Sequence, residues 1–344
     1  MRHLSETFFV PLALEAYEGN DYARFQKRIA RSNRFPLKPF AILAGLLNGA
    51  ILAALAVILR LFGRARPDQY DRDLGRLYFH VPEMAVHKRI ELDAFVTRGN
   101  CLVGRCVDIG CGNGFVGGIL KRMTSIEELQ GVDPVESFVN DTSANGYSGF
   151  SCATASKIPL ESASFDCVVS ICVMEHIPDL DGALREALRL LRPGAALVLT
   201  TPAPEFRTSA ITARLWSLLG LHERAEVAAR LRDKVSMHFH YAAADEWRKN
   251  LAAIGFDRVD VVPFFSMRQM LAYEIMNWPV RIPELYFPDK LWVLCNRVRP
   301  LMHGLAWSTA VIGAWVARWS VRDGCHTHWL ISARRPETES GLVG

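Results

Sequence analysis

A run of glycines after a short apolar stretch has the clearest capacity for chemistry in this sequence. Gly110, Gly112 and Gly114 follow Asp108 at alternate positions, and an apolar helical pattern comes next. Glycine is required where the backbone takes a positive φ or where a ligand lies against the main chain. Asp133 ends the next apolar run, where a carboxylate can accept hydrogen bonds from a ribose. These residues predict a nucleoside-binding turn between a strand and a helix.

Two classes of cofactor suit such a turn. The spacing Gly112-x-Gly114-x-x-Gly117 formally matches the dinucleotide fingerprint, which would make the protein an NAD(P)-dependent oxidoreductase. Asp108 weighs against this alternative, because a dinucleotide-binding strand is normally apolar to its end. We therefore keep the oxidoreductase as the less favoured hypothesis.

Histidines supply the candidates for a general base, since imidazole titrates near neutral pH. We consider His176, His238 and His240, with the alternative that His176 only shapes the cofactor pocket. His238 and His240 alternate as on an extended segment, so at most one of them faces the site. This pair lacks further ligands for zinc, and we predict no metal site. Near the end of the chain we interpret the pair His326 and His328 as structural.

Composition excludes several classes of protein. Half of the 344 residues are hydrophobic and 22% are charged, which excludes a disordered chain. Forty basic residues against 36 acidic ones give a net charge of +4, too small an excess for a dedicated nucleic-acid binder. The eight cysteines show no paired CxxC spacing, so we expect buried free thiols in a reducing cytosol.

Short β-rich runs alternate with helical patterns from about residue 105 onward, which predicts βαβ units and a mostly parallel sheet. Two of the helical patterns lie at Leu180–Leu191 and Ala243–Ile254, and Gly255 ends the second. The seven candidate strands are Cys106–Ile109, Leu129–Asp133, Phe150–Thr154, Phe165–Cys172, Ala196–Thr201, Arg258–Pro263 and Thr327–Ala333.

An N-terminal extension, residues 1–100, precedes these units and contains an uncharged apolar stretch at 40–59. Twenty residues of helix extend roughly 30 Å, the thickness of the hydrocarbon layer of a membrane. Gly45 and Gly49 are spaced as in closely packed membrane helices. We predict a membrane-spanning helix, with a buried core helix as the alternative.

A second apolar segment, residues 264–324, lies between the last two strands. Because both strands belong to one sheet, this insertion must cross a membrane an even number of times. Its tryptophans favour a membrane interface over the hydrocarbon centre. We interpret it as amphipathic helices that lie on a membrane or cover the acceptor pocket, and the alternative is an extra helical layer packed on the protein.

The segments from about residue 104 to 334 resemble a class I S-adenosyl-L-methionine-dependent methyltransferase. The resemblance rests on Asp108-Ile-Gly-Cys-Gly-Asn-Gly114, on Asp133 and on four later segments in the family's order. These segments are Ile158–Leu160, Ser164–Val168, Val173–Asp179 and Leu191–Gly194. It implies a Rossmann-like α/β fold with a seven-stranded, mostly parallel sheet, an antiparallel last strand and helices on both faces. The methyltransferase domain would comprise residues 101–263 and 325–336, with a tail at 337–344.

The resemblance implies S-adenosyl-L-methionine as the cofactor. Many relatives carry an aspartate for the adenine amino group where this sequence has Thr154, whose hydroxyl can still accept that bond. Glu175 is a candidate for cofactor or acceptor contact, although a loop-stabilising role is the alternative. The cofactor-binding residues that we expect are Asp108, Gly110, Gly112, Gly114, Asp133, Thr154 and Glu175.

The expected function is methyl transfer to an oxygen of a small lipophilic or membrane-presented acceptor, such as a quinone, a lipid or a lipid-linked sugar. We expect a membrane-associated protein whose catalytic domain lies in the cytoplasm, without a nucleic-acid partner. The alternative is a methyltransferase-like, membrane-bound binding module without turnover.

Overall fold

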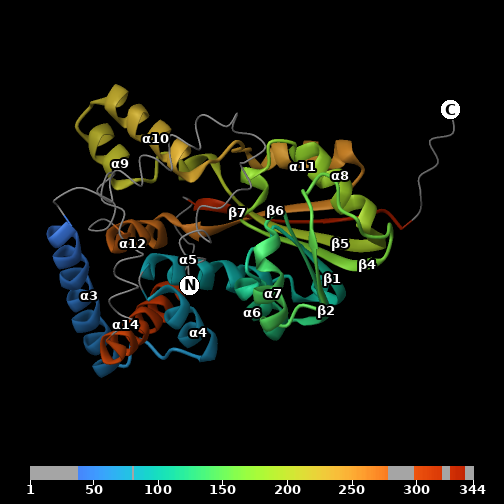
Figure 1. Cartoon of the computed structure of the whole chain (residues 1–344). Coiled ribbons are helices and arrows are strands. Elements are labelled where there is room, and N and C mark those ends of the chain that lie inside the picture. The colour runs from blue at the N-terminus through green and yellow to red at the C-terminus, as the bar shows by residue number, and fades with distance from the viewer. Residues whose placement is uncertain (1–37, 80, 278–297, 320–325, 338–344) are drawn as a thin grey trace.

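A seven-stranded sheet forms the centre of the molecule in this computed structural model, which describes residues 38–79, 81–277, 298–319 and 326–337 (Figure 1). The strand order is β3-β2-β1-β4-β5-β7-β6. All neighbouring strands are parallel except at β7, which is antiparallel to both β5 and β6. The strands are β1 Val103–Ile109, β2 Ser125–Asp133, β3 Gly149–Cys152, β4 Phe165–Ile171, β5 Leu191–Pro202, β6 Asp257–Ser266 and β7 His326–Arg334. The predicted Rossmann-like sheet is confirmed, and each predicted strand overlaps an observed one.

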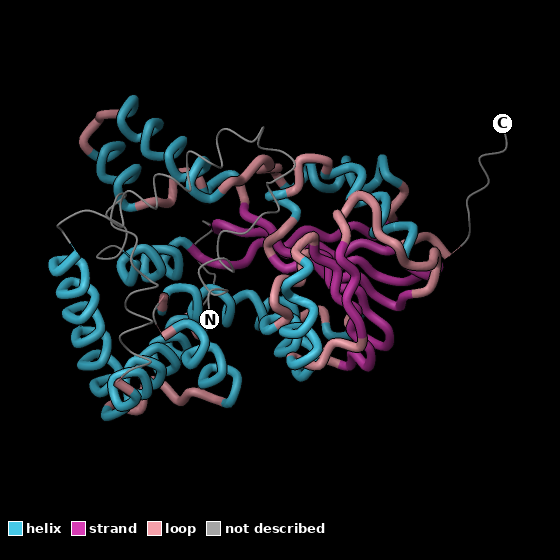
Figure 2. Tube along the Cα trace, in the orientation of Figure 1, coloured by secondary structure: helices cyan, strands magenta, loops and turns pink. Residues whose placement is uncertain are grey.

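Alternation of side chains along the strands builds two cores, one on each face of the sheet. Cys106, Val169 and Val198 face the core that contains α5 (Pro82–Val96) and α6 (Phe115–Met123). Val107 and Leu197 face the core that contains α8 (Leu180–Leu190) and α11 (Ala244–Ile254). Figure 2 shows the helices on both sides of the magenta strands. As predicted, α11 ends at Gly255, whose φ is +114°.

The apolar N-terminal stretch forms one long helix, α3 (Lys38–Leu61). Its buried residues Leu52, Ala56 and Leu59 lie on one side, and α3 packs against α14 (Arg299–Ala317) of the insertion. A Cβ added at Gly49 would lie 2.8 Å from Leu305, so this glycine permits the close approach of α14. The packing therefore corresponds to the alternative in which the hydrophobic helix belongs to the protein's own core.

No helix within the described part of the chain is long and apolar enough to cross a membrane. This finding does not support the membrane-spanning helix predicted at 40–59. α3 exposes one apolar face while it also buries another, so the stretch has no polar stripe.

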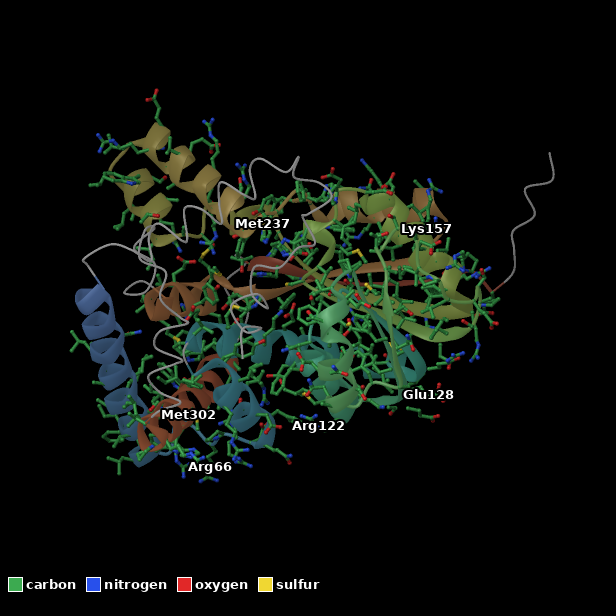
Figure 3. All side chains as sticks on the ribbon, in the orientation of Figure 1. Arg66, Arg122, Glu128, Lys157, Met237 and Met302 are labelled. Atoms are coloured by element: carbon green, nitrogen blue, oxygen red, sulfur yellow. The ribbon has the colours of Figure 1, made fainter. Side chains whose placement is uncertain are left out.

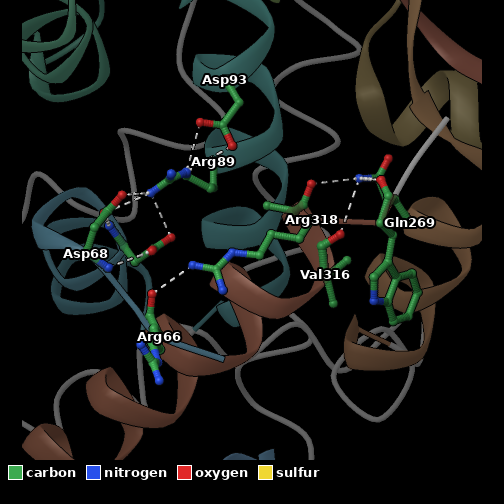
Figure 4. Close-up of polar contacts among 10 residues, drawn as sticks. Arg66, Asp68, Arg89, Asp93, Gln269, Val316 and Arg318 are labelled. Carbon is green, nitrogen blue, oxygen red and sulfur yellow. Dashed lines mark hydrogen bonds and ion pairs between the residues drawn. The ribbon is translucent and has the colours of Figure 1, made fainter. Parts of the chain in front are cut away.

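The insertion and the N-terminal extension form one layer, which we call the helical platform: α3, α4 (Gln69–Tyr78), α5, α12 (Met267–Asn277) and α14. Arg89 of α5 joins this helix to α4 through ion pairs with Asp68 and Asp71, and it also pairs with Asp93 of α5. Arg318 donates to the carbonyl of Arg66 at 2.9 Å (Figure 4). The described part of the insertion is thus an extra layer on the protein, which was the alternative interpretation.

Further hydrogen bonds hold the helices of the platform together. The side-chain amide of Gln269 in α12 donates to the carbonyl oxygens of Val316 and Trp319 at 3.3 and 3.1 Å (Figure 4). Asn48, the polar residue within the apolar stretch of α3, donates to the carbonyl oxygen of Met276. Two further helices, α9 (Ile211–Leu218) and α10 (His222–Ser236), lie between β5 and β6 in the chain and project away from the sheet in Figure 1. Trp278 and Trp292 of the insertion lie outside the described residues.

Candidate functional site

The turn after β1 takes the conformation that its glycines predict. Gly110, Gly112 and Gly114 have φ values of +77°, +53° and +76°. The amides of Gly110 and Cys111 donate to the carbonyl oxygen of Val132 in β2, at 2.8 and 3.2 Å. The turn is therefore fixed to the neighbouring strand before α6 begins. A Cβ added at Gly112 would meet no atom within 4 Å, which leaves open space directly over the turn.

Asp133 lies at the end of β2 and holds the same turn. Its Oδ2 accepts from the amide of Gly112 and its Oδ1 from the amide of Val135, both at 3.0 Å. The side chain is buried, and burial raises its pKa to about 6 despite these hydrogen bonds. Each carboxylate oxygen has a second lone pair, which can accept a hydrogen bond from a further donor such as a ribose hydroxyl.

Asp108 is a second buried carboxylate below the turn. Its Oδ2 accepts from the hydroxyl of Tyr147 at 2.5 Å, while its Oδ1 has no hydrogen-bond partner among the described residues. Burial, together with the nearby charge of Asp133, raises the pKa of Asp108 to about 7. Sequence reasoning missed Tyr147, because nothing local marks a tyrosine after α7 (Val139–Ala144) as a partner of β1.

These residues fit S-adenosyl-L-methionine. The open space over Gly112 lets a ligand contact the backbone, and Asp133 lies beside it with acceptor capacity for the ribose. Oδ1 of Asp108, which has no partner in the described part of the chain, can accept from an ammonium group, which the amino-acid part of that cofactor carries. The hydrogen-bond donors of the ligand, its ribose hydroxyls and its ammonium group, therefore match the carboxylate acceptors of the site.

A second group of polar side chains follows β4, in the 3₁₀ turn Met174–His176. Glu175 is 1% exposed, and its Oε2 has no hydrogen-bond partner within the described residues. Burial raises the pKa of Glu175 to about 8. Nδ1 of His176 lies 3.1 Å from the carbonyl oxygen of Met237, and its Nε2 lies 3.8 Å from Oε1 of Glu175. Since a carbonyl only accepts, the His176 proton is on Nδ1 and Nε2 is free to accept another.

His238 joins this group, whereas His240 does not. The ring centroids of His176 and His238 are 4.8 Å apart, and Nδ1 of His238 lies 2.8 Å from the hydroxyl of Tyr241. His240 instead lies 2.9 Å from the carbonyl oxygen of Ile177 through its Nε2. Met237, whose carbonyl oxygen contacts His176, follows α10 and is labelled in Figure 3. Thr154 follows β3, and its carbonyl accepts from the amide of Lys157.

Sequence reasoning also missed an aromatic group that adjoins these histidines. Phe206 lies between His238 and His328, with ring centroids 5.4 and 5.3 Å away. His87 from α5 lies against His328, at 5.0 Å between ring centroids. These residues come from four separate segments, so that only the folded chain brings them together.

Comparisons with known proteins agree with this geometry. Residues 107–199 match the family described as a methyltransferase domain. The chain is 34% identical to 27-O-demethylrifamycin SV methyltransferase from Amycolatopsis mediterranei over 104 residues, 28% of this chain and 37% of that protein. It is 28% identical to the ubiquinone biosynthesis O-methyltransferase of Rhizobium rhizogenes over 102 residues, 28% of this chain and 40% of that protein.

The chain spans only 30 to 40% of the length of curated relatives such as these and the sterol 4-C-methyltransferase of Caenorhabditis elegans. That last relative is 32% identical over 102 residues, 27% of this chain and 30% of its own. Among solved structures, the phosphoethanolamine N-methyltransferase 2 of Haemonchus contortus aligns with a TM-score of 0.44 at 16% identity, over 72% of this chain and 52% of that chain.

The family match, the glycine turn and the sheet order together identify a class I S-adenosyl-L-methionine-dependent methyltransferase domain. S-adenosyl-L-methionine is the cofactor of this class.

Proposed function

We propose that the protein transfers the methyl group of S-adenosyl-L-methionine to an oxygen of a small lipophilic acceptor. The observation that carries this proposal is the position of the Glu175–His176 pair after β4, one strand from the cofactor turn after β1. Carboxyl ends of neighbouring parallel strands meet at one edge of the sheet, so the base and the cofactor turn share that edge.

The bound cofactor supplies an electrophilic methyl group on a sulfonium centre. The chain's residues orient the reactants and remove one proton. Asp133, fixed by two backbone amides, orients the sugar, and Asp108 accepts from the ammonium. Nε2 of His176 accepts the proton of the acceptor hydroxyl, and Oε1 of Glu175 lies 3.8 Å from that nitrogen.

A surface feature supports a membrane-presented acceptor. The outward face of α3 exposes Leu47, Ile51, Ile58 and Leu61, at 61%, 58%, 50% and 79%. Arg60, Arg64 and Arg66 surround its C-terminal end. An apolar face bordered by cations suits a helix that lies in the surface of an anionic membrane. We propose that the protein attaches peripherally to the cytoplasmic leaflet in this way.

Transfer of label from methyl-labelled S-adenosyl-L-methionine tests the proposed reaction. The substrate is a lipid extract from a strain that lacks the protein, and the product is expected in the organic phase. His176→Gln should reduce the rate by about 10² to 10⁴-fold while cofactor binding is retained. Binding of the cofactor without label transfer to any extract would favour the module without turnover.

A further inference from the structure

Three metal-ligating side chains meet beside the proposed acceptor site. They are His87 from α5, Cys172 directly after β4 and His328 from β7, and one ligand atom from each lies within 4.8 Å of the others. The Nε2 atoms of the two histidines are 3.3 Å apart. We propose that these residues bind one zinc-type transition-metal ion.

The distance between the histidines fits this role. Two nitrogens that each lie 2.0–2.1 Å from a tetrahedral zinc ion are separated by about 3.3 Å, the separation seen here. A ligand set of two imidazoles and one thiolate favours Zn²⁺ or Co²⁺ over Mg²⁺, which prefers oxygen. Three protein ligands also leave a fourth position open, as in catalytic zinc sites.

His328 is already oriented as a ligand. Its Nδ1 lies 2.9 Å from the hydroxyl of Thr327, which itself donates to the carbonyl oxygen of Phe265 at 3.2 Å. Since a hydroxyl has one proton, Thr327 must accept from Nδ1 of His328, and the lone pair of the imidazole is on Nε2. Such a partner on the distal nitrogen is typical of metal-bound histidines. The ring of Phe265, 5.0 Å away between centroids, restricts the imidazole further.

Cys172 is held in an unusual conformation. Its φ is +52°, a value that a residue with a side chain rarely adopts. The amide of Cys172 donates to the backbone carbonyl and to the hydroxyl of Thr200, at 3.2 and 3.1 Å. With this backbone, Sγ of Cys172 lies within 4.8 Å of a ligand nitrogen of each histidine.

Acidic side chains lie beside this group. The carboxyl groups of Glu91 and Glu175 lie near the Cys172 thiol. Glu91 is fully buried, and the neighbouring cation, Lys88, already pairs with it at 2.7 Å. An acceptor oxygen in the open fourth position would be polarised by the metal, an assignment that rests on the proposed function.

Cobalt substitution tests the site. Full-length protein is stripped with a chelator and titrated with Co²⁺ alone, and the expected result is one ion per chain with a thiolate-to-cobalt band in the near ultraviolet. Cys172→Ser should abolish the band, whereas Cys152→Ser, at an exposed thiol, should leave it unchanged. Thr327→Val should weaken Zn²⁺ binding by about 10 to 100-fold, because it removes the partner of His328.

Two results would overturn the proposal. One is the absence of a thiolate band in the wild-type protein. The other is loss of the bound ion in His238→Gln but not in His328→Gln, which would place the ion at the neighbouring group of Glu175, His176 and His238. Calorimetry on the metal-free protein measures the binding of S-adenosyl-L-methionine without the metal. It therefore separates a failure of this metal site from a failure of the proposed function.

Discussion

Two buried carboxylates define the cofactor site at the residue scale. Asp108 and Asp133 are 2% and 3% exposed, and burial raises the pKa values of both side chains. Their desolvation costs stability in the ligand-free protein. The hydroxyls and the ammonium of the cofactor would offset that cost when they bind. The carboxylates therefore lower the stability of the ligand-free protein and raise its affinity for the ligand.

Asp108→Asn should stabilise the ligand-free protein at pH 8. The pKa of Asp108 is about 7 in the folded protein against its ordinary value of 3.8, so the wild type loses stability as the pH rises through this range. The shift corresponds to at most about 4 kcal/mol at full ionisation. Chemical denaturation of both proteins should show this gain at pH 8 and little difference at pH 4. Equal differences at both pH values would contradict the assignment.

At the scale of the element, the turn between β1 and α6 separates residues needed for the ligand from residues needed for the fold. Gly112 faces open space, whereas a Cβ at Gly117 would lie 2.0 Å from the hydroxyl of Tyr147 and 2.4 Å from Oδ2 of Asp108. Both glycines belong to one sequence pattern, but their surroundings differ.

The variants Gly112→Ala and Gly117→Ala should therefore differ. Gly112→Ala should cost only about 1–2 kcal/mol of stability, from its positive φ, yet remove the rise in melting temperature that S-adenosyl-L-methionine causes. Gly117→Ala should destabilise the protein by about 1–3 kcal/mol through overpacking. Thermal denaturation with and without the cofactor measures both effects. A full ligand-induced shift in Gly112→Ala would exclude the open space as the binding position.

At the scale of the whole molecule, the sheet was predictable from sequence, whereas the helical platform was not. A short, nearly continuous apolar run marks a buried strand such as β4 locally. The packing of α3 on α14 joins segments about 250 residues apart, which no local pattern reports. No local pattern predicts the contact between His87 and His328 either, because this contact depends on where α5 lies on the sheet. The glycine turn was predictable because its residues are adjacent in sequence.

The exposed face of α3 leads to a prediction about the whole molecule. The double variant Ile51→Glu/Ile58→Glu should lose binding to vesicles that contain anionic lipid, while its melting temperature stays unchanged because both side chains are exposed. Val139→Glu, on the exposed surface of α7, is the matched control and should still bind. Sedimentation with vesicles measures the bound fraction, and undiminished binding of the double variant would refute peripheral attachment through α3.

Calorimetric titration with S-adenosyl-L-methionine tests the central claim most directly, namely that the turn after β1 and Asp133 bind this cofactor. We expect one site per chain in the wild type and in Asp181→Ala, which removes an exposed carboxylate on α8. Asp133→Ala should weaken binding on the order of 100-fold, because two hydrogen bonds to a charged acceptor are lost. Unchanged affinity in folded Asp133→Ala protein would contradict the account.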